Sequence, residues 1–340
     1  MISYYIYLLF IVFGSVFLKK KRFFLNYSGD VHQSFSNVGN IPLTGGIFLI
    51  IPIIFFYSND LILVFFFSTI FLIGFFSDRK ILISAKIRFF FQIFLILSFV
   101  IITDLKILTS KIELFDMMLN NRLFAYFFSS FCLLILINGS NFIDGLNGLL
   151  ISYSLIVIYI LGNLGLVSDQ IIFDQYFYVI VSVLFVLLSL NILNILMIGD
   201  SGAYLLGFFL GFTIISSHVN NADVSPYFYI SLIWYPCFEN LFSILRKLNR
   251  KLSPLNPDNK HLHQLVFFLI KKKLGLSVIL SNNLSSAILI FFNFLIIHIC
   301  SLNPGSTIFQ VKLIICSIIF YISGYFLLKK FYELNFSFKK

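Results

Sequence analysis

The stretch NGSNFIDG contains two asparagines and an aspartate that recur at every third position: Asn138, Asn141 and Asp144. On a helix this spacing keeps the three side chains within one arc of the circumference, so they can face the same ligand. The glycines that follow, Gly145 and Gly148, let the backbone approach a phosphate or a neighbouring helix closely. Polar contact between packed helices is the alternative. Two amides, a carboxylate and two glycines at the edge of an apolar run favour a ligand site.

A second carboxylate, Asp200, lies in IGDSGAYLLG, between a glycine and a small polar turn that precedes another apolar run. Capping and the helix dipole alone favour a carboxylate at the start of a helix. The same position also suits Mg²⁺, which takes a few carboxylate or amide oxygens and completes its shell with water and substrate phosphates. Asp200, Asn141 and Asp144 could supply such ligands if their loops meet.

Two histidines, His261 and His263, lie in SPLNPDNKHLHQL, directly after the basic stretch RKLNRK. Zinc is one alternative, but no further Cys or His has a matching spacing. Histidines beside cations suit a pyrophosphate better. An ordinary basic loop next to a membrane explains the cations but not the paired histidines.

Two further stretches carry weaker signals. HQSFSNVGNIPLTGG contains His32 and a Pro-x-x-Gly-Gly pattern at the start of an apolar run, which a plain turn with helix-packing glycines would also show. GFFSDRK places Asp78 at the abrupt end of a Phe-rich run. Asp78 is either the solvated end of a helix or part of a site at the membrane face.

The elements that position these residues must be membrane helices. Of the 340 residues 59% are hydrophobic and 11% charged, and the mean hydropathy is +0.99, which predicts an all-α polytopic membrane protein with residues 1–340 as a single domain. The net charge of +10 comes from short basic clusters between apolar runs, a pattern typical of cytoplasmic membrane loops and not of nucleic-acid binding. Apolar runs predict about ten to eleven transmembrane helices, at 3–18, 42–57, 61–76, 87–104, 123–138, 146–163, 175–198, 202–217, 226–245, 284–300 and 308–328.

The basic residues also predict an orientation. With the N-terminus outside, every Lys and Arg falls in a predicted inside segment except Lys106, Lys111, Arg122 and Lys312. The same alternation brings the Asp78, Asn141–Asp144, Asp200 and His261 stretches to the inside face. Their convergence on one face predicts an active site that is formed by the cytoplasmic loops. A transporter would instead spread its polar residues to the middle of the membrane.

Together these stretches resemble the polyprenyl-phosphate N-acetylhexosamine-1-phosphate transferases. NGSNFIDGLNGLL resembles the family's N-x-x-N-x-x-D-G-x-x-G-L element, IGDSGAYLLG its G-D-x-G element and NKHLHQL its H-x-H-H loop. GFFSDRKILISAKIRFFFQ resembles its paired-aspartate segment with the basic residues and glutamine that follow. The resemblance runs from His32 to about Gln264, with the motifs in the family's order.

The resemblance implies an enzyme that moves a sugar 1-phosphate from a UDP-sugar to a lipid phosphate and releases UMP. It implies Mg²⁺, with Mn²⁺ as an alternative, held by Asp200 with help from Asn141. Asp78 and Asp144 are expected near the acceptor phosphate and the nucleotide, and these two with Asp200 form the expected catalytic set. The expected substrate-binding residues are His32, Lys86, Arg88, Asn138, Asn141, His261 and His263; of these the histidine pair would contact the pyrophosphate, and Lys86 or Arg88 would balance phosphate charge.

This chain departs from the family's pattern at three positions. Ser77 stands where the first of two aspartates is usual, Asn147 where an aspartate is frequent, and Gln264 where a third histidine is common. The chain also lacks the element of the muramoyl-pentapeptide branch, which favours the branch that starts O-antigen and related surface polysaccharides. The expected partners are a UDP-sugar, undecaprenyl phosphate and the bilayer of a bacterial inner membrane, with a homodimer left open. A flippase for an anionic lipid and an inactive donor-binding relative are the alternatives.

Overall fold

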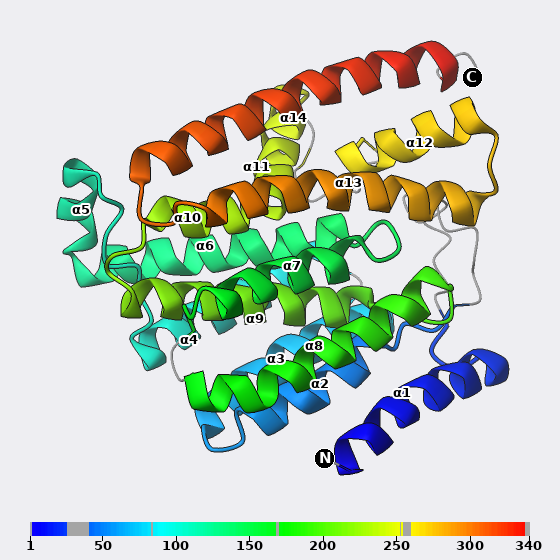
Figure 1. Cartoon of the computed structure of the whole chain (residues 1–340), viewed down its shortest axis with the longest axis horizontal. Helices are drawn as coiled ribbons and strands as arrows, with labels where there is room; N and C mark the ends of the chain where they lie inside the picture. The colour runs from blue at the N-terminus through cyan, green and yellow to red at the C-terminus, as the bar shows by residue number, and fades with distance from the viewer. Residues whose placement is uncertain are drawn as a thin grey trace.

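The computed structural model describes residues 2–25, 41–82, 84–167, 170–251, 253 and 260–336. Helices dominate this part of the chain (Figure 1). In chain order they are α1 (Ile2–Lys21), α2 (Gly45–Phe56), α3 (Leu61–Asp78), α4 (Ala85–Thr103), α5 (Glu113–Leu119), α6 (Arg122–Ile143), α7 (Leu149–Asn163), α8 (Gln170–Ile192), α9 (Gly199–Asn220), α10 (Pro226–Leu232), α11 (Trp234–Asn249), α12 (Leu262–Leu274), α13 (Val278–Ser301) and α14 (Thr307–Phe336).

The prediction of an all-α polytopic membrane protein is confirmed. Within the described ranges, 6 helices (α3, α4, α6, α9, α13 and α14) are long and apolar enough to cross a membrane, and the bent pair α10–α11 raises the number to 7. Three shorter apolar helices (α2, α7 and the Tyr178–Ile192 part of α8) and helix α1 account for the other predicted runs. Two short helices were not predicted: α5 follows the α4 run, and α12 lies in a segment expected to be an inside loop.

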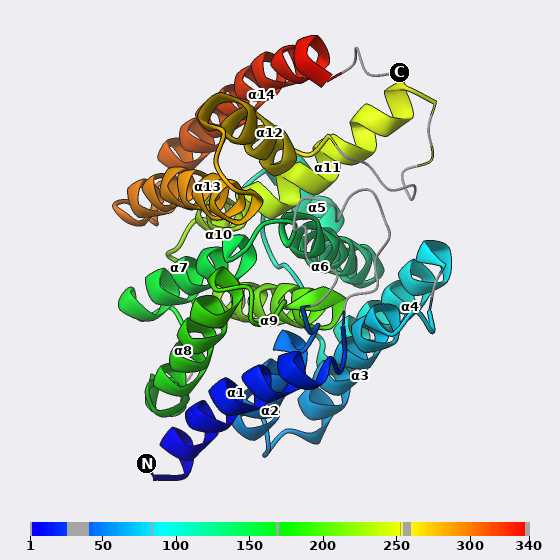
Figure 2. The same cartoon turned by 90° about the vertical axis from the view of Figure 1, so that its right-hand side faces the viewer.

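Helix α9 is the centre of the bundle. Figure 2 shows it surrounded by other helices, and it packs against α2, α3 and α6. In its most apolar window 83% of the residues are buried, against 17% for α14. Small residues allow the close approach of α3, because a Cβ added at Gly74 would lie 2.5 Å from the Cα of Ser201. The helix that begins with Gly199-Asp200 is therefore fixed by packing along its whole length.

One predicted helix, 226–245, is in fact broken. It bends by 77° between α10 and α11. Pro236 has no N–H and cannot donate to the carbonyl oxygen of Leu232 one turn earlier. The hydroxyl of Tyr153 on α7 donates to that oxygen instead, at 2.8 Å. The bend depends on this contact with another helix as well as on the proline, so the apolar run alone could not predict it.

The turns that carry the predicted site residues meet at one end of the bundle. The turn after α6 and the start of α9 lie toward the right-hand end in Figure 1, where α3 also ends. Short contacts join these elements: the backbone N–H of Gly46 at the start of α2 donates to the carbonyl oxygen of Ile198, just before α9, at 3.2 Å. The fold thus gathers four helix ends around Asp200.

Candidate active site

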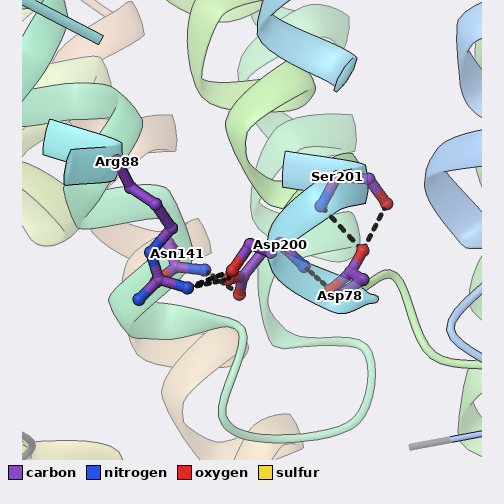
Figure 3. Close-up of polar contacts among 6 residues, drawn as sticks. Asp78, Arg88, Asn141, Asp200 and Ser201 are labelled. Carbon is purple, nitrogen blue, oxygen red and sulfur yellow. Dashed lines mark hydrogen bonds and ion pairs between the residues drawn. The ribbon is translucent and has the colours of Figure 1, made fainter. Parts of the chain in front are cut away.

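Asp200, in the first turn of α9, accepts hydrogen bonds from three other helices (Figure 3). Its Oδ1 accepts from the side-chain amide of Asn141 on α6 at 2.7 Å. Its Oδ2 forms an ion pair with Arg88 Nη1 of α4 at 3.2 Å and accepts from the hydroxyl of Ser77 on α3. Arg88 Nη1 also contacts the Ser77 hydroxyl. The carboxylate is held in one orientation, and four of the elements that were expected to meet do so.

Asp78, the last residue of α3, is directed at the backbone of α9 (Figure 3). Its Oδ1 accepts from the Asp200 N–H at 2.8 Å, and its Oδ2 accepts from the N–H and the hydroxyl of Ser201 at 3.1 and 2.7 Å. The first N–H groups of a helix have no partner within the helix, so Asp78 acts as a cap supplied by a different helix. A Cβ at Gly199, which has φ +73°, would lie 2.7 Å from the Asp78 carboxylate. A glycine is therefore required here for both its conformation and its size.

Asp144 directly follows α6 and is half-buried. Burial, together with the nearby carboxylates of Asp200 and Asp78, raises the pKa of Asp144 well above its usual range. Arg88 supplies one positive charge to this group of three carboxylates. A cation bound beside these carboxylates would lower the pKa of Asp144 again.

The side chains around Asp200 include carboxylate and amide oxygens, the ligand type that Mg²⁺ takes. In the described part of the chain, no group of three or more His, Cys, Asp or Glu side chains is arranged to hold a metal. Mg²⁺ needs only one or two carboxylates when substrate phosphates and water complete its octahedron. Asn141 faces Asp200 through its NH₂ group, so it could offer its oxygen to a metal only after the amide rotates.

His261, just before α12, lies against the site through an aromatic contact. Its ring centroid is 5.1 Å from that of Phe142, which directly follows Asn141. Its Nδ1 lies 2.9 Å from Oε1 of Glu239 on α11, and its backbone N–H donates to the side chain of Gln264 at 3.0 Å. Gln264, where the related proteins commonly have a third histidine, thus completes a capping box at the start of α12.

His263 differs from His261 in being packed into the protein. It is 1% exposed, its ring stacks on that of His261 at 5.5 Å, and a Cβ added at Gly145 would lie 2.4 Å from its Nε2. Burial, with the adjacent His261, lowers the pKa of His263 to about 3. The ring is neutral near pH 7, so in this arrangement it holds the turn after Asp144 and carries no charge toward a phosphate.

The other predicted site residues are not in contact with Asp200. The amide of Asn138 donates to Gln92 Oε1 at 3.1 Å and to the Leu134 carbonyl oxygen at 2.9 Å. Lys86 is exposed on the first turn of α4, two positions before Arg88. Of the two cations expected to balance phosphate charge, Arg88 therefore lies at Asp200. His32 lies outside the described residues.

A group of asparagines that sequence reasoning did not assign fixes the turn between α6 and α7. The Asn147 N–H donates to Asn282 Oδ1 at 2.7 Å, and its side-chain NH₂ donates to Asn194 and Asn283 at 3.0 Å each. The Gly148 N–H donates to Asn191 Oδ1 at 2.5 Å. An amide at position 147 can donate to these oxygens, which an aspartate cannot do.

Two other contributors were missed. Ser201 helps to orient Asp78, and Glu239 contacts His261. A signal for Glu239 was present, because a lone carboxylate inside a predicted membrane helix marks a functional position by default. Ser201 is an ordinary helix-start serine, and nothing in the sequence distinguishes it.

The comparison with known proteins agrees with this geometry. A family model described as Glycosyl transferase family 4 matches residues 61–218, a range that includes every residue bonded to Asp200 or Asp78 in Figure 3. Residues 61–218 of this chain match glycosyl transferase family 4. The sequence-based identification is confirmed, and so is the multi-pass membrane class that goes with it.

Curated relatives that this chain matches share one name, undecaprenyl-phosphate alpha-N-acetylglucosaminyl 1-phosphate transferase. The Yersinia pestis protein is 27% identical over 67% of this chain and 66% of its own length, and the Escherichia coli K12 protein is 26% identical over 42% and 41%. The Thermotoga maritima protein is 25% identical over 84% of this chain and 89% of its own length. The chain thus matches less than two thirds of the length of the first two relatives.

Proposed function

We propose that this protein transfers an N-acetylhexosamine 1-phosphate from a UDP-sugar to undecaprenyl phosphate and releases UMP. The observation that carries the proposal is the carboxylate of Asp200, held by three other helices beside Asp78 and Asp144, with one arginine on it. Burial and the neighbouring carboxylates raise the pKa of Asp144, and a bound cation would stabilise its charged form. A metal-bound nucleoside diphosphate sugar supplies both the cation and the phosphates to occupy the site. The shared name of the relatives supports the same substrates.

In the proposed reaction an oxygen of the lipid phosphate forms a bond to the β-phosphorus of the UDP-sugar. The bond from that phosphorus to the bridging oxygen breaks, and UMP leaves with the electron pair. Mg²⁺, held by Asp200 and by Asn141 after rotation of its amide, would neutralise the diphosphate and the departing UMP. The lipid phosphate is already ionised near pH 7, so the reaction requires positioning more than proton removal.

The protein's own residues divide this work. Asp78 fixes the start of α9 and so the direction of Asp200. If Asp200 held Mg²⁺, Arg88 would be available to bind a phosphate oxygen, because a planar guanidinium serves either anion. Asp144 lies at the turn that the asparagines fix, near the carboxylates of Asp200 and Asp78. This position suits a role beside the acceptor phosphate.

The proposed setting is the inner membrane of a bacterium, with the site facing the cytoplasm and the product starting an O-antigen or a related polysaccharide. The distribution of basic residues supports this orientation. Lys19, Lys20 and Lys21 end α1, Lys271, Lys272 and Lys273 end α12, and Arg88 lies just inside α4.

A donor screen with the purified protein tests the proposal. UDP-GlcNAc, UDP-GalNAc and UDP-glucose are each incubated with undecaprenyl phosphate and Mg²⁺, and the lipid product and UMP are measured by mass spectrometry. We expect a lipid diphosphate sugar and an equal amount of UMP from an N-acetylated donor, and none after EDTA treatment. UDP-sugar binding without UMP release would identify an inactive relative, in keeping with Ser77, and lipid movement without transfer would identify a flippase.

A further inference from the structure

The side chain of Glu239 on α11 is completely buried (0% exposed) within an apolar helix pair. Its Oε1 lies 2.9 Å from His261 Nδ1, and its Oε2 accepts the hydroxyl proton of Tyr321 on α14 at 2.6 Å. An ionised carboxylate out of water is costly unless hydrogen bonds and an opposite charge compensate it. A merely structural position would hold an apolar or amide side chain at lower cost, so the carboxylate needs an explanation.

The contact with Glu239 determines which nitrogen of His261 carries a proton. A carboxylate only accepts, so Nδ1 must be the donor, and the second nitrogen, Nε2, is left for another partner. Histidines that bind metals are oriented by partners in the same manner.

Neighbouring side chains fix the ring of His261 in place. Phe142 lies against it at 5.1 Å and His263 stacks on it at 5.5 Å with an interplanar angle of 11°. The Gln264 side chain accepts from its backbone N–H. Phe142 directly follows Asn141, so the fixed ring packs on the same end of α6 that carries Asn141 and Asp144.

We propose that Glu239 is a positioning residue for the donor: it holds His261 with the Nδ1 proton toward α11, so that the second nitrogen, Nε2, is left for the UDP-sugar. This inference rests on the proposed function. It separates the two histidines of the HLH sequence, because His261 has an acidic partner and a place at the site, whereas His263 is packed against Gly145. Tyr321 supports Glu239 and has a smaller role.

Steady-state kinetics of Glu239→Gln test the proposal, with UDP-GlcNAc as the donor probe or UDP-GalNAc if the screen selects it. Gln keeps the size of the side chain and an acceptor for Nδ1–H but removes the charge. We expect the KM for the UDP-sugar to rise about tenfold, while the KM for undecaprenyl phosphate changes by less than about twofold. Tyr321→Phe keeps the charge and is expected to raise the donor KM by no more than about threefold.

The matched control is Asn240→Ala, at the next residue of α11. Asn240 is also buried (4% exposed) and makes one hydrogen bond to α6, to the carbonyl oxygen of Ile135 at 2.9 Å. It perturbs the same helix without touching His261. If Asn240→Ala shifts the donor KM as much as Glu239→Gln does, the effect is structural and the proposal is overturned.

A double-mutant cycle with His261→Gln asks whether Glu239 acts through the histidine. If it does, Glu239→Gln adds little to the loss of donor affinity already caused by His261→Gln, within about twofold. Additive losses, or equal changes in both substrates' KM values, overturn the proposal while leaving the transferase function intact. A wild-type protein that transfers no sugar 1-phosphate overturns the proposed function and this inference with it.

Discussion

Two aspartates at helix ends, Asp200 and Asp104, bind an arginine in nearly the same way and have different surroundings. Arg88 lies 3.2 Å from Asp200, and Arg122 lies 3.3 Å from Asp104. The Asp104 side chain is 51% exposed, and that of Asp200 is 28% exposed. Each therefore has an ion pair, and each is reached by water to some extent.

The difference lies in the balance of charge. Asp104 also binds Lys106 at 2.8 Å and the hydroxyl of Tyr126, so two cations surround one carboxylate. Hydrogen bonds from Lys106 and Tyr126 hold the pKa of Asp104 down to about 2. At Asp200 the ion pair with Arg88 lies beside two further carboxylates, and the pKa of Asp144 is raised. A compensated cluster ties a loop to a helix, whereas an uncompensated one is arranged for a ligand.

The largest effect is expected from Asp200→Ala. This substitution removes the carboxylate that would hold Mg²⁺ and orient the diphosphate, so sugar 1-phosphate transfer should fall by about 10³-fold. Radiolabel transfer from the UDP-sugar to lipid measures it, and the apparent melting temperature checks that the protein still folds. Normal Mg²⁺-dependent turnover by this variant would remove the metal role assigned to Asp200.

The adjacent pair Ser77 and Asp78 comes next. Asp78→Asn replaces one of two oxygens that accept three hydrogen bonds from the start of α9, so we expect a stability loss of about 1–3 kcal/mol and loss of most activity. Ser77→Ala removes one hydrogen bond to Asp200, and activity should fall by no more than about fivefold. Transfer rates and melting temperatures of Asp78→Asn and Ser77→Ala show which of the two substitutions has the larger effect. The opposite ranking would mean that Ser77, and not Asp78, is the more important neighbour of Asp200.

The order of apolar and polar stretches was sufficient to predict much of this site. Apolar runs identified the membrane helices, and the alternation of basic loops brought Asn141, Asp144 and Asp200 to one face. The helix period grouped Asn138, Asn141 and Asp144; the structure places Asn141 at Asp200, whereas the amide of Asn138 bonds to Gln92. The apolar runs, the basic loops and the helix period are properties of single segments, so they can be read from the sequence without knowledge of the tertiary contacts.

Contacts between distant segments could not be predicted in this way. Asp78 caps α9 only because Gly74 lets α3 and α9 approach closely, and the bend before α11 depends on Tyr153 from α7. The packing of His263 against Gly145 likewise requires α12 to fold over the turn after α6. Each of these three contacts results from tertiary packing, and the residue pattern within one segment does not predict it.

A pH effect on stability is expected from His263, next to the uncompensated cluster. Its folded pKa of about 3 lies below the ordinary value near 6.5, so the unfolded chain takes up a proton first as the pH falls. Stability should therefore decrease by about 1.4 kcal/mol per pH unit below pH 6.5, or about 2 kcal/mol at pH 5. Melting temperatures at pH 7.5 and pH 5 should differ more for the wild type than for His263→Gln.

The wild type must be compared with His263→Gln because Asp144 changes stability with pH in the opposite direction from His263. Its raised pKa makes the folded state gain stability as the pH falls through the folded value, and the effect is present in both chains. The exposed His298 on α13 offers a matched substitution, and His298→Gln should keep the wild-type difference. An unchanged pH dependence in His263→Gln would show that another group causes the acid sensitivity.

The smallest effect is expected at the compensated cluster. Asp104→Ala leaves Lys106 and Arg122 without their carboxylate, but both have access to water, and exposed ion pairs contribute little to stability. Transfer activity should be unchanged, and the melting temperature should fall only slightly, less than for Asp78→Asn. A loss of activity comparable to that of Asp200→Ala would mean that charge balance does not distinguish the two clusters.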